Sequence, residues 1–190
     1  MKRLALLVTS LLFLAPGAAS ASIIVGVPDA DILSDAVSAS LTLTVEFEGS
    51  YDVDSYELTV LLSGRDGATG LTFDGAAAAA VDYVFMDSVG WSTVTDEDYL
   101  IYGDDGASSG PETLADTTKN MITVNLVLDS VTVGDIFDVT IDPSGSAIYD
   151  RDYQEFNVIW DGGVITIIPE PMSVSLLLFG GLAALARRRR

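Results

Sequence analysis

Apolar and polar residues alternate with a period of two over much of the chain between residues 22 and 168. Over 41–48, leucine, valine and phenylalanine fill the odd positions, while threonine and glutamate fill the even ones. Over 56–62, apolar residues return at every even position. Successive side chains of a strand point to opposite faces, so this alternation predicts half-buried antiparallel strands.

Shorter apolar rows bounded by glycine, aspartate, serine or proline predict further strands, because these residues favour turns. The rows lie at 71–73, 81–85, 91–94, 99–102, 121–128, 135–141, 156–160 and 164–168. The turn at 161–163 is expected to join the last two rows as a hairpin. A polar loop is expected over 104–119, and the five alanines at 76–80 predict a short helical segment at the surface.

About nine short strands without a long helix predict an all-β domain, folded as a single antiparallel β-sandwich. In strand order, and in the run 122–141 followed by an aromatic strand and Gly-Gly-Val-Ile-Thr-Ile at 162–167, the chain resembles cohesin-like and carbohydrate-binding sandwiches, within the broader immunoglobulin-like architecture. Cohesin-like domains bind a partner module through one sheet face. The resemblance therefore implies a binding role, but no motif matches closely enough to transfer individual binding residues.

The first 21 residues have the layout of a secretory signal peptide. Lys2 and Arg3 supply the positive start, 4–14 form the apolar core, and the small residues Ala19-Ser20-Ala21 fit the cleavage pattern. Cleavage is expected just before Ser22. The domain that follows is then exported from the cytoplasm.

The segment 169–190 combines three different pieces. Pro169, Glu170 and Pro171 hold the chain extended, and the following residues, 172–186, carry no charge. A helix over 172–186 would be about 22 Å long, which approaches the roughly 30 Å hydrocarbon core of a membrane. The positive cluster behind it extends the span and fixes the orientation, with the bulk of the protein outside the cytoplasm. That cluster consists of Arg187, Arg188, Arg189 and Arg190.

This order of motif, apolar span and arginine cluster resembles the PEP-CTERM sorting signal of exported bacterial proteins. The resemblance implies that an exosortase-type membrane protease recognises Pro169, Glu170 and Pro171 and cleaves nearby, after transient anchoring in the inner membrane. The alternative is an ordinary C-terminal anchor that happens to follow two prolines. The predicted organisation is a signal peptide at 1–21, a β-sandwich ectodomain at 22–168 and a sorting signal at 169–190.

Charge and composition exclude several classes of function. Of the 9 basic and 28 acidic residues, six bases and one acid lie in the terminal segments, which leaves 3 basic and 27 acidic groups and a formal net charge of −24 between them. Such a surface repels nucleic-acid phosphates, so no nucleic acid is expected as a partner. The chain has no cysteine and no histidine, which removes disulfides, the usual zinc sites and histidine-based triads. We expect a protein that is not an enzyme.

Close pairs of acidic residues raise the possibility of calcium binding, since this ion prefers several oxygen ligands. No pair extends to the helix-loop-helix calcium motif. Two acidic clusters that flank one short predicted strand are the candidates: Asp96, Asp98, Asp104 and Asp105. The alternative is that these carboxylates cap turns on an acidic surface. No other cofactor is expected.

Aromatic residues offer a second kind of site, because flat rings stack on sugar faces. Tyr149 and Tyr153, in an aspartate-rich loop, are expected to be the exposed pair, whereas Trp160 continues an apolar row and is expected in the core. The alternative is that most of the aromatic rings pack in the core.

These features predict an exported, non-enzymatic protein of the cell surface or extracellular matrix, processed at its C-terminal signal and associated with exopolysaccharide and biofilm. The alternative function is a carbohydrate- or protein-binding module that stays anchored in the membrane as a surface protein. A glycosidase would need two carboxylates in a cleft, and abundant carboxylates alone do not indicate one.

Overall fold

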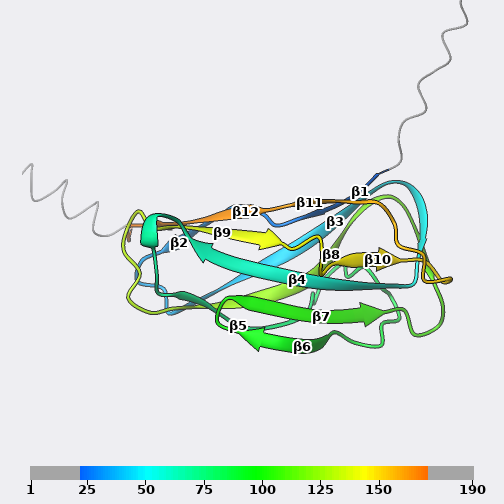
Figure 1. Cartoon of the computed structure of the whole chain (residues 1–190), viewed down its shortest axis with the longest axis horizontal. Coiled ribbons are helices and arrows are strands. Elements are labelled where there is room, and N and C mark those ends of the chain that lie inside the picture. Colours follow the sequence, from blue (N-terminus) through cyan, green and yellow to red (C-terminus); the bar gives the residue numbers. More distant parts are fainter. Residues whose placement is uncertain (1–21, 171–190) are drawn as a thin grey trace, which may run out of the picture.

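The computed structural model describes residues 22–170, which fold into two β-sheets packed face to face (Figure 1). The strands are β1 (Ser22–Gly26), β2 (Ala30–Leu33), β3 (Ser38–Val53), β4 (Ser55–Gly64), β5 (Leu71–Ala78), β6 (Ser92–Glu97), β7 (Leu100–Gly106), β8 (Glu112–Leu128), β9 (Ile136–Ile141), β10 (Ala147–Tyr149), β11 (Val158–Asp161) and β12 (Gly163–Ile168). A single 3-10 turn, η1 (Arg65–Gly67), follows β4, and the described part holds no α-helix. The predicted all-β sandwich is confirmed.

The two sheets differ in size and order. The five-stranded sheet has the order β11-β1-β3-β8-β5, and its long central strands pair antiparallel from Ser38↔Val127 to Val53↔Glu112. The seven-stranded sheet has the order β2-β12-β9-β4-β7-β6, with β10 paired to the end of β4. Strands β5 and β6 are the edges of different sheets, yet they lie along the same side of the sandwich (Figure 1).

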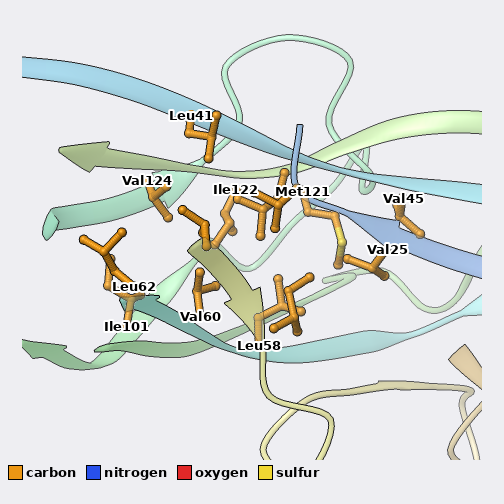
Figure 2. Close-up of a cluster of buried hydrophobic side chains, with 14 of the residues drawn as sticks. Val25, Leu41, Val45, Leu58, Val60, Leu62, Ile101, Met121, Ile122 and Val124 are labelled. Atoms are coloured by element: carbon orange, nitrogen blue, oxygen red, sulfur yellow. The ribbon is translucent and has the colours of Figure 1, made fainter. Parts of the chain in front are cut away.

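Alternate residues of both sheets fill the space between them with aliphatic and aromatic side chains. Leu43 and Val45 point inward from β3, and Leu58 and Val60 point inward from β4, with none of their surface exposed. Met121 lies among them in the middle of the core (Figure 2). Removing this apolar surface from water is the main stabilising contribution to the fold. The strands predicted from alternation over 41–48 and 56–62 are confirmed.

The first two strands and the last two strands are each divided between the two sheets. Strand β1 belongs to the five-stranded sheet and β2 to the other, and β11 and β12 divide in the same way. The pairs β1–β11 and β2–β12 are parallel, so the sandwich is not purely antiparallel. The predicted hairpin across 161–163 is therefore wrong: Gly162 carries the chain from one sheet to the other.

Three local predictions are also wrong, each because tertiary contacts override the local pattern. Ala76, Ala77 and Ala78 belong to β5 and pair with β8, so strand pairing outweighs the helix propensity of alanine. The expected loop at 104–119 instead contains the end of β7 and the first half of β8. The expected strand at 81–85 is irregular, and Val81 is 72% exposed. Strands β1, β2 and β10 were not predicted.

The described chain enters the sandwich at one end of its long axis and leaves it at the other (Figure 1). Ser22 starts β1, and exposed Pro169 directly follows β12. Residues 22–170 include no helix long and apolar enough to cross a membrane. The predicted signal peptide at 1–21 and the predicted membrane helix at 172–186 lie outside the described residues.

Candidate functional site

The outer face of the seven-stranded sheet is the candidate site. Leu58 and Val60 of β4 and Ile101 of β7 lie in the core with no exposed surface. Side chains alternate along a strand, so the neighbours of these residues point outward. This outer face of β4 and β7 carries Glu57, Leu61, Leu100, Tyr102 and Asp104; we call these five residues the docking face. Thr59, between Glu57 and Leu61, is buried, and its hydroxyl donates to the carbonyl of Gly145 at 2.7 Å.

Strand register places the apolar members of the docking face at one end and the acidic members at the other. Leu61 is paired with Leu100, and both are only partly buried. Four residues back along β4, Glu57 is paired with Asp104. Side chains of directly paired residues lie within about 5.5 Å at their Cβ atoms. The docking face therefore offers an apolar contact area at one end and two adjacent carboxylates about 13 Å away at the other, with buried Thr59 between them.

Two tyrosines hold the carboxylate of Glu57 in place. The Tyr149 hydroxyl donates to Oε1 at 2.6 Å, and the Tyr102 hydroxyl donates to Oε2 at 3.1 Å. The hydrogen bond to Glu57 raises the pKa of Tyr149 to about 12 and also raises the pKa of Tyr102. Both tyrosines stay protonated near neutral pH and act as donors, so Glu57 is oriented before any ligand arrives.

The acidic end of the docking face has no matching cation in the described structure. Of the three bases between the terminal segments, Arg65 and Lys119 are bound elsewhere, to Asp138 at 2.5 Å and to Asp82 at 2.6 Å, and the exposed Arg151 forms no ion pair with the described residues. Like charges on directly opposite strand positions repel each other. A positively charged group placed against this end would relieve the repulsion.

The outer face of the five-stranded sheet differs in chemistry. Its small polar side chains bond to each other: Thr42 Oγ1 lies 3.0 Å from Thr123 Oγ1, and the Ser40 hydroxyl donates to Asn125 Oδ1 at 3.1 Å. Hydroxyl and amide groups that already have partners gain little from a second one. These four side chains therefore gain less from a partner than polar groups that lack a hydrogen bond.

The four aspartates predicted to bind calcium do not come together. Asp104 points outward from β7 and is exposed, whereas its neighbour Asp105 points inward and is 2% exposed. On β6, Asp96 is paired with Ile101 and Ser92 with Asp104, which separates Asp96 from Asp104 by roughly 13 Å along the strand. Asp98 lies in the turn after β6. The described residues contain no group of three or more histidine, cysteine or acidic side chains placed to hold a metal.

Asp105 instead forms a buried polar cluster that sequence reasoning missed. Its carboxylate accepts hydrogen bonds from the hydroxyls of Tyr83 and Ser88 and from the backbone N–H groups of Gly90 and Gly106. The only hydrogen of the Tyr83 hydroxyl goes to Asp105, so the Tyr56 hydroxyl donates to Tyr83 at 2.7 Å. Burial raises the pKa of both tyrosines. The sequence could have indicated this position, because Asp105 lies an even number of residues from buried Ile101 on the same strand and therefore points to the same side.

Tyr149 and Tyr153 do not form the predicted exposed pair. Tyr149 is partly buried and its hydroxyl is bound to Glu57. Tyr153 is 76% exposed and occupies the left-handed region, with φ 56°, in a turn whose N–H groups bond to Asp150. Trp160 is partly buried at the margin of the core. The structure thus supplies no stacked sugar platform from these residues.

The predicted sorting residues are only partly described. Pro169 is exposed and Glu170 is partly exposed, immediately after β12. Pro171 and the arginines at 187–190 lie outside the described residues. Because β12 is hydrogen-bonded to β9 on one side and to β2 on the other, it is an internal strand rather than an edge.

Comparison of the structure with solved structures shows consistent likeness to one kind of domain. The third cohesin of ScaC from Acetivibrio cellulolyticus, solved in complex with the ScaB dockerin, matches with a TM-score of 0.59 and 16% identity over 77% of this chain and 99% of that one. The fold is that of cohesins. A non-cellulosomal cohesin from Archaeoglobus fulgidus matches with a TM-score of 0.56 and 14% identity, over 82% of this chain and 96% of that one.

A third cohesin, the seventh type I cohesin of ScaB from Pseudobacteroides cellulosolvens, gives a TM-score of 0.59 at 12% identity, covering 78% of this chain and 94% of that one. No family model matches the sequence, and no curated protein matches it. The predicted likeness to cohesin sandwiches is confirmed at the level of the fold. Identities this low show the fold alone, and function depends on the site residues of this chain.

Proposed function

We propose that this chain is a non-catalytic protein-binding module and that its partner binds to the docking face. The observation that carries the proposal is that one face presents the Leu61–Leu100 pair at one end and the oriented Glu57 with the exposed Asp104 about 13 Å along the strands at the other. Partly exposed apolar side chains next to a polar rim are the usual anatomy of a protein interface. The similar ScaC cohesin was solved in complex with a dockerin, which supports a protein as the partner.

The partner is expected to carry a lysine or arginine about 13 Å from an aliphatic side chain, to match the spacing of the two pairs. The cation would lie against Glu57 and Asp104, and the aliphatic group would cover Leu61 and Leu100. Electrostatic complementarity of this kind mainly sets specificity and association rate, while the apolar contact supplies affinity. The formal net charge of −24 between the terminal segments would further favour a basic partner at long range.

The proposal includes export and anchoring at the cell surface. It rests on the signal-like layout of 1–21 and on the motif, apolar span and arginine cluster of 169–190. Processing by an exosortase-type enzyme and association with exopolysaccharide remain predictions from the sequence. They concern where the module works, whereas the docking face concerns what it binds.

The docking face is tested by matched charge reversals on opposite faces of the sandwich. Full-length wild-type protein, Asp104→Lys and Glu46→Lys are used to capture exported proteins of the source cells, and the affinity of each captured protein is then measured after purification. Asp104 and Glu46 are both exposed strand residues, and Glu46 lies on the outer face of the five-stranded sheet. We expect Asp104→Lys to weaken binding at least about tenfold and Glu46→Lys to leave it unchanged. A second docking-face variant, Leu61→Ser, is measured in the same way. The proposal would be contradicted if Asp104→Lys and Glu46→Lys weakened binding equally, or if neither Asp104→Lys nor Leu61→Ser weakened it.

A further inference from the structure

The segment 79–91, which we call the strap, crosses from one sheet to the other along one side of the sandwich. It connects β5, the edge of the five-stranded sheet, to β6, the edge of the seven-stranded sheet. The Ala79 N–H donates to the carbonyl of Met121 at the β8 end, and the Val89 N–H donates to the carbonyl of Gly106 at the β7 end. The strap therefore bridges the two sheets.

The backbone of the strap is fixed along its length by hydrogen bonds to the body of the domain. The Val84 N–H donates to the carbonyl of Asn120 at 2.9 Å, and the Met86 N–H donates to Oε2 of Glu112 at 2.8 Å. In the opposite direction, the Ser108 N–H donates to the carbonyl of Asp87 at 2.7 Å. Although the strap has no regular secondary structure, it has little freedom to move.

Buried side chains anchor the strap from beneath. Phe85 is 3% exposed, and its ring stacks on Tyr56 with a centroid distance of 5.8 Å. Trp91 stacks on the same tyrosine at 6.1 Å. The Asp105 cluster adds polar anchors, because Tyr83, Ser88 and Gly90 all donate to its carboxylate.

Above these anchors, the strap exposes apolar side chains to solvent. Met86 is 91% exposed and Val89 is 68% exposed. Hydrophobic side chains held on a rigid backbone bind a partner without the entropy cost of ordering a loop. Methionine also adapts its shape to different partners because its side chain is unbranched and flexible.

A shallow groove with a volume of about 320 Å³ lies beside Met86. Asp87 and Glu112 supply carboxylates to its lining, and Ala107 and Pro111 supply apolar surface. Hydrogen bonds from Ser108 and Ser109 lower the pKa of Asp87, which keeps this carboxylate ionised. None of the described residues that line the groove is a lysine or an arginine, so the groove is complementary to a positive group.

We propose that the strap and this groove form a second docking site, which takes an extended peptide segment carrying a lysine or arginine next to an aliphatic residue. The aliphatic side chain packs on Met86 and Val89, and the cation enters the groove between Asp87 and Glu112. A groove of this size accepts individual side chains of a peptide rather than the broad surface of a folded domain. The site shares no residue with the docking face.

The test uses a defined probe, a synthetic peptide of sequence Gly-Leu-Lys-Leu-Arg-Gly, and a matched peptide with glutamate in place of lysine and arginine. Titrations of isotope-labelled full-length protein followed by NMR report which backbone amides respond. We expect the basic peptide to shift the amides of Met86, Val89, Ala107 and Glu112, and to lose affinity in higher salt. The acidic peptide should give no shifts.

Variants then distinguish binding at the strap from binding elsewhere on the domain. Val89→Ser should weaken peptide binding about fivefold or more, a usual cost for an interface anchor. Val133→Ser, at an exposed valine outside the strap, should leave binding unchanged, as should Leu61→Ser on the docking face. Shifts confined to β4 and β7, equal affinity for both peptides, or no binding at millimolar peptide would each overturn the proposal. A failure here leaves the docking-face proposal standing, because Leu61→Ser and Asp104→Lys test that proposal separately.

Discussion

The carbonyl oxygen of Val27 lies 2.6 Å from the position that a Cβ atom on Gly163 would occupy. The carbonyl oxygen of Pro28 lies nearly as close, at 2.7 Å. The two connections that switch sheets therefore touch each other, and only glycine fits at this contact. The Val27 N–H also donates to the carbonyl of Asp161 at 3.0 Å, which ties the first connection to the second.

Gly163→Ala is expected to lower the free energy of unfolding by about 1–3 kcal/mol or more, because both contacts are backbone atoms that cannot rotate away. Urea denaturation followed by circular dichroism measures the change. Gly26→Ala is the matched control in β1: its added carbon would meet nothing closer than Thr44 Oγ1 at 3.9 Å. Similar stability of the two variants would show that the crossover contact has room for a methyl group.

Asp105→Ala is expected to destabilise the protein by at least about 2 kcal/mol. The substitution leaves the part-buried hydroxyls of Tyr83 and Ser88 without their acceptor, and each such loss costs about 1–3 kcal/mol. Hydrogen exchange should accelerate most at the amides of Gly90 and Val89. Asp104→Asn, at the exposed neighbouring position, should change neither quantity, and uniform acceleration throughout the domain would argue against a local anchoring role.

The buried tyrosine pair should make the protein sensitive to alkali. Burial raises the pKa of Tyr56 and of Tyr83 above the ordinary value of 10.0, so the folded state resists an ionisation that the unfolded state accepts. Stability is then complete below pH 10 and falls as pH rises above it, by up to about 1.4 kcal/mol per pH unit for Tyr56. Denaturation at several pH values measures this slope. Tyr56→Phe should reduce it, and an unchanged slope would show that Tyr56 is not the group responsible.

The ion pair between Arg65 and Asp138 is expected to matter little for stability. It is exposed, and exposed pairs contribute roughly 0–1 kcal/mol. The hydrogen bond from Arg65 lowers the pKa of Asp138, so this contribution is present above the ordinary aspartate value of 3.8 and is lost as pH falls further. In Arg65→Met the Asp138 pKa, followed by NMR, should return toward 3.8. If it stays low, another group must stabilise the carboxylate.

Sequence patterns predicted strands best where one side chain in two enters the core. The row Leu41, Leu43, Val45 and Phe47 reads clearly because the opposite face is polar. In the first half of β8 the pattern fails, since Leu114 is the sole buried residue over 112–120 and the remaining side chains lie outside the core. Pairing with β3 keeps that half of β8 extended, and a local residue pattern cannot predict a pairing partner that is distant in the sequence.

The docking face could not be recognised from sequence because its members come from β4 and β7, which lie far apart along the chain. The tyrosine that orients Glu57 is farther still: Glu57 and Tyr149 are separated by 92 positions and meet only once β10 pairs with β4. Likewise, the aspartates grouped by their nearness in sequence separate in the fold, since Asp104 and Asp105 necessarily point to opposite faces of β7. Closeness along a strand is thus a poor guide to a shared site unless strand parity is taken into account.

Entry and exit of the sandwich at opposite ends of its long axis have a mechanical consequence. Tension applied between Ser22 and Ile168 would pull β1 and β12 lengthwise past their neighbours, β3 and β11 for the first and β9 and β2 for the second. Loaded in this shear direction, the hydrogen bonds along each strand bear the force together instead of opening one after another. A module built in this way would withstand pulling forces along its length, while the docking face and the strap remain accessible to a bound protein.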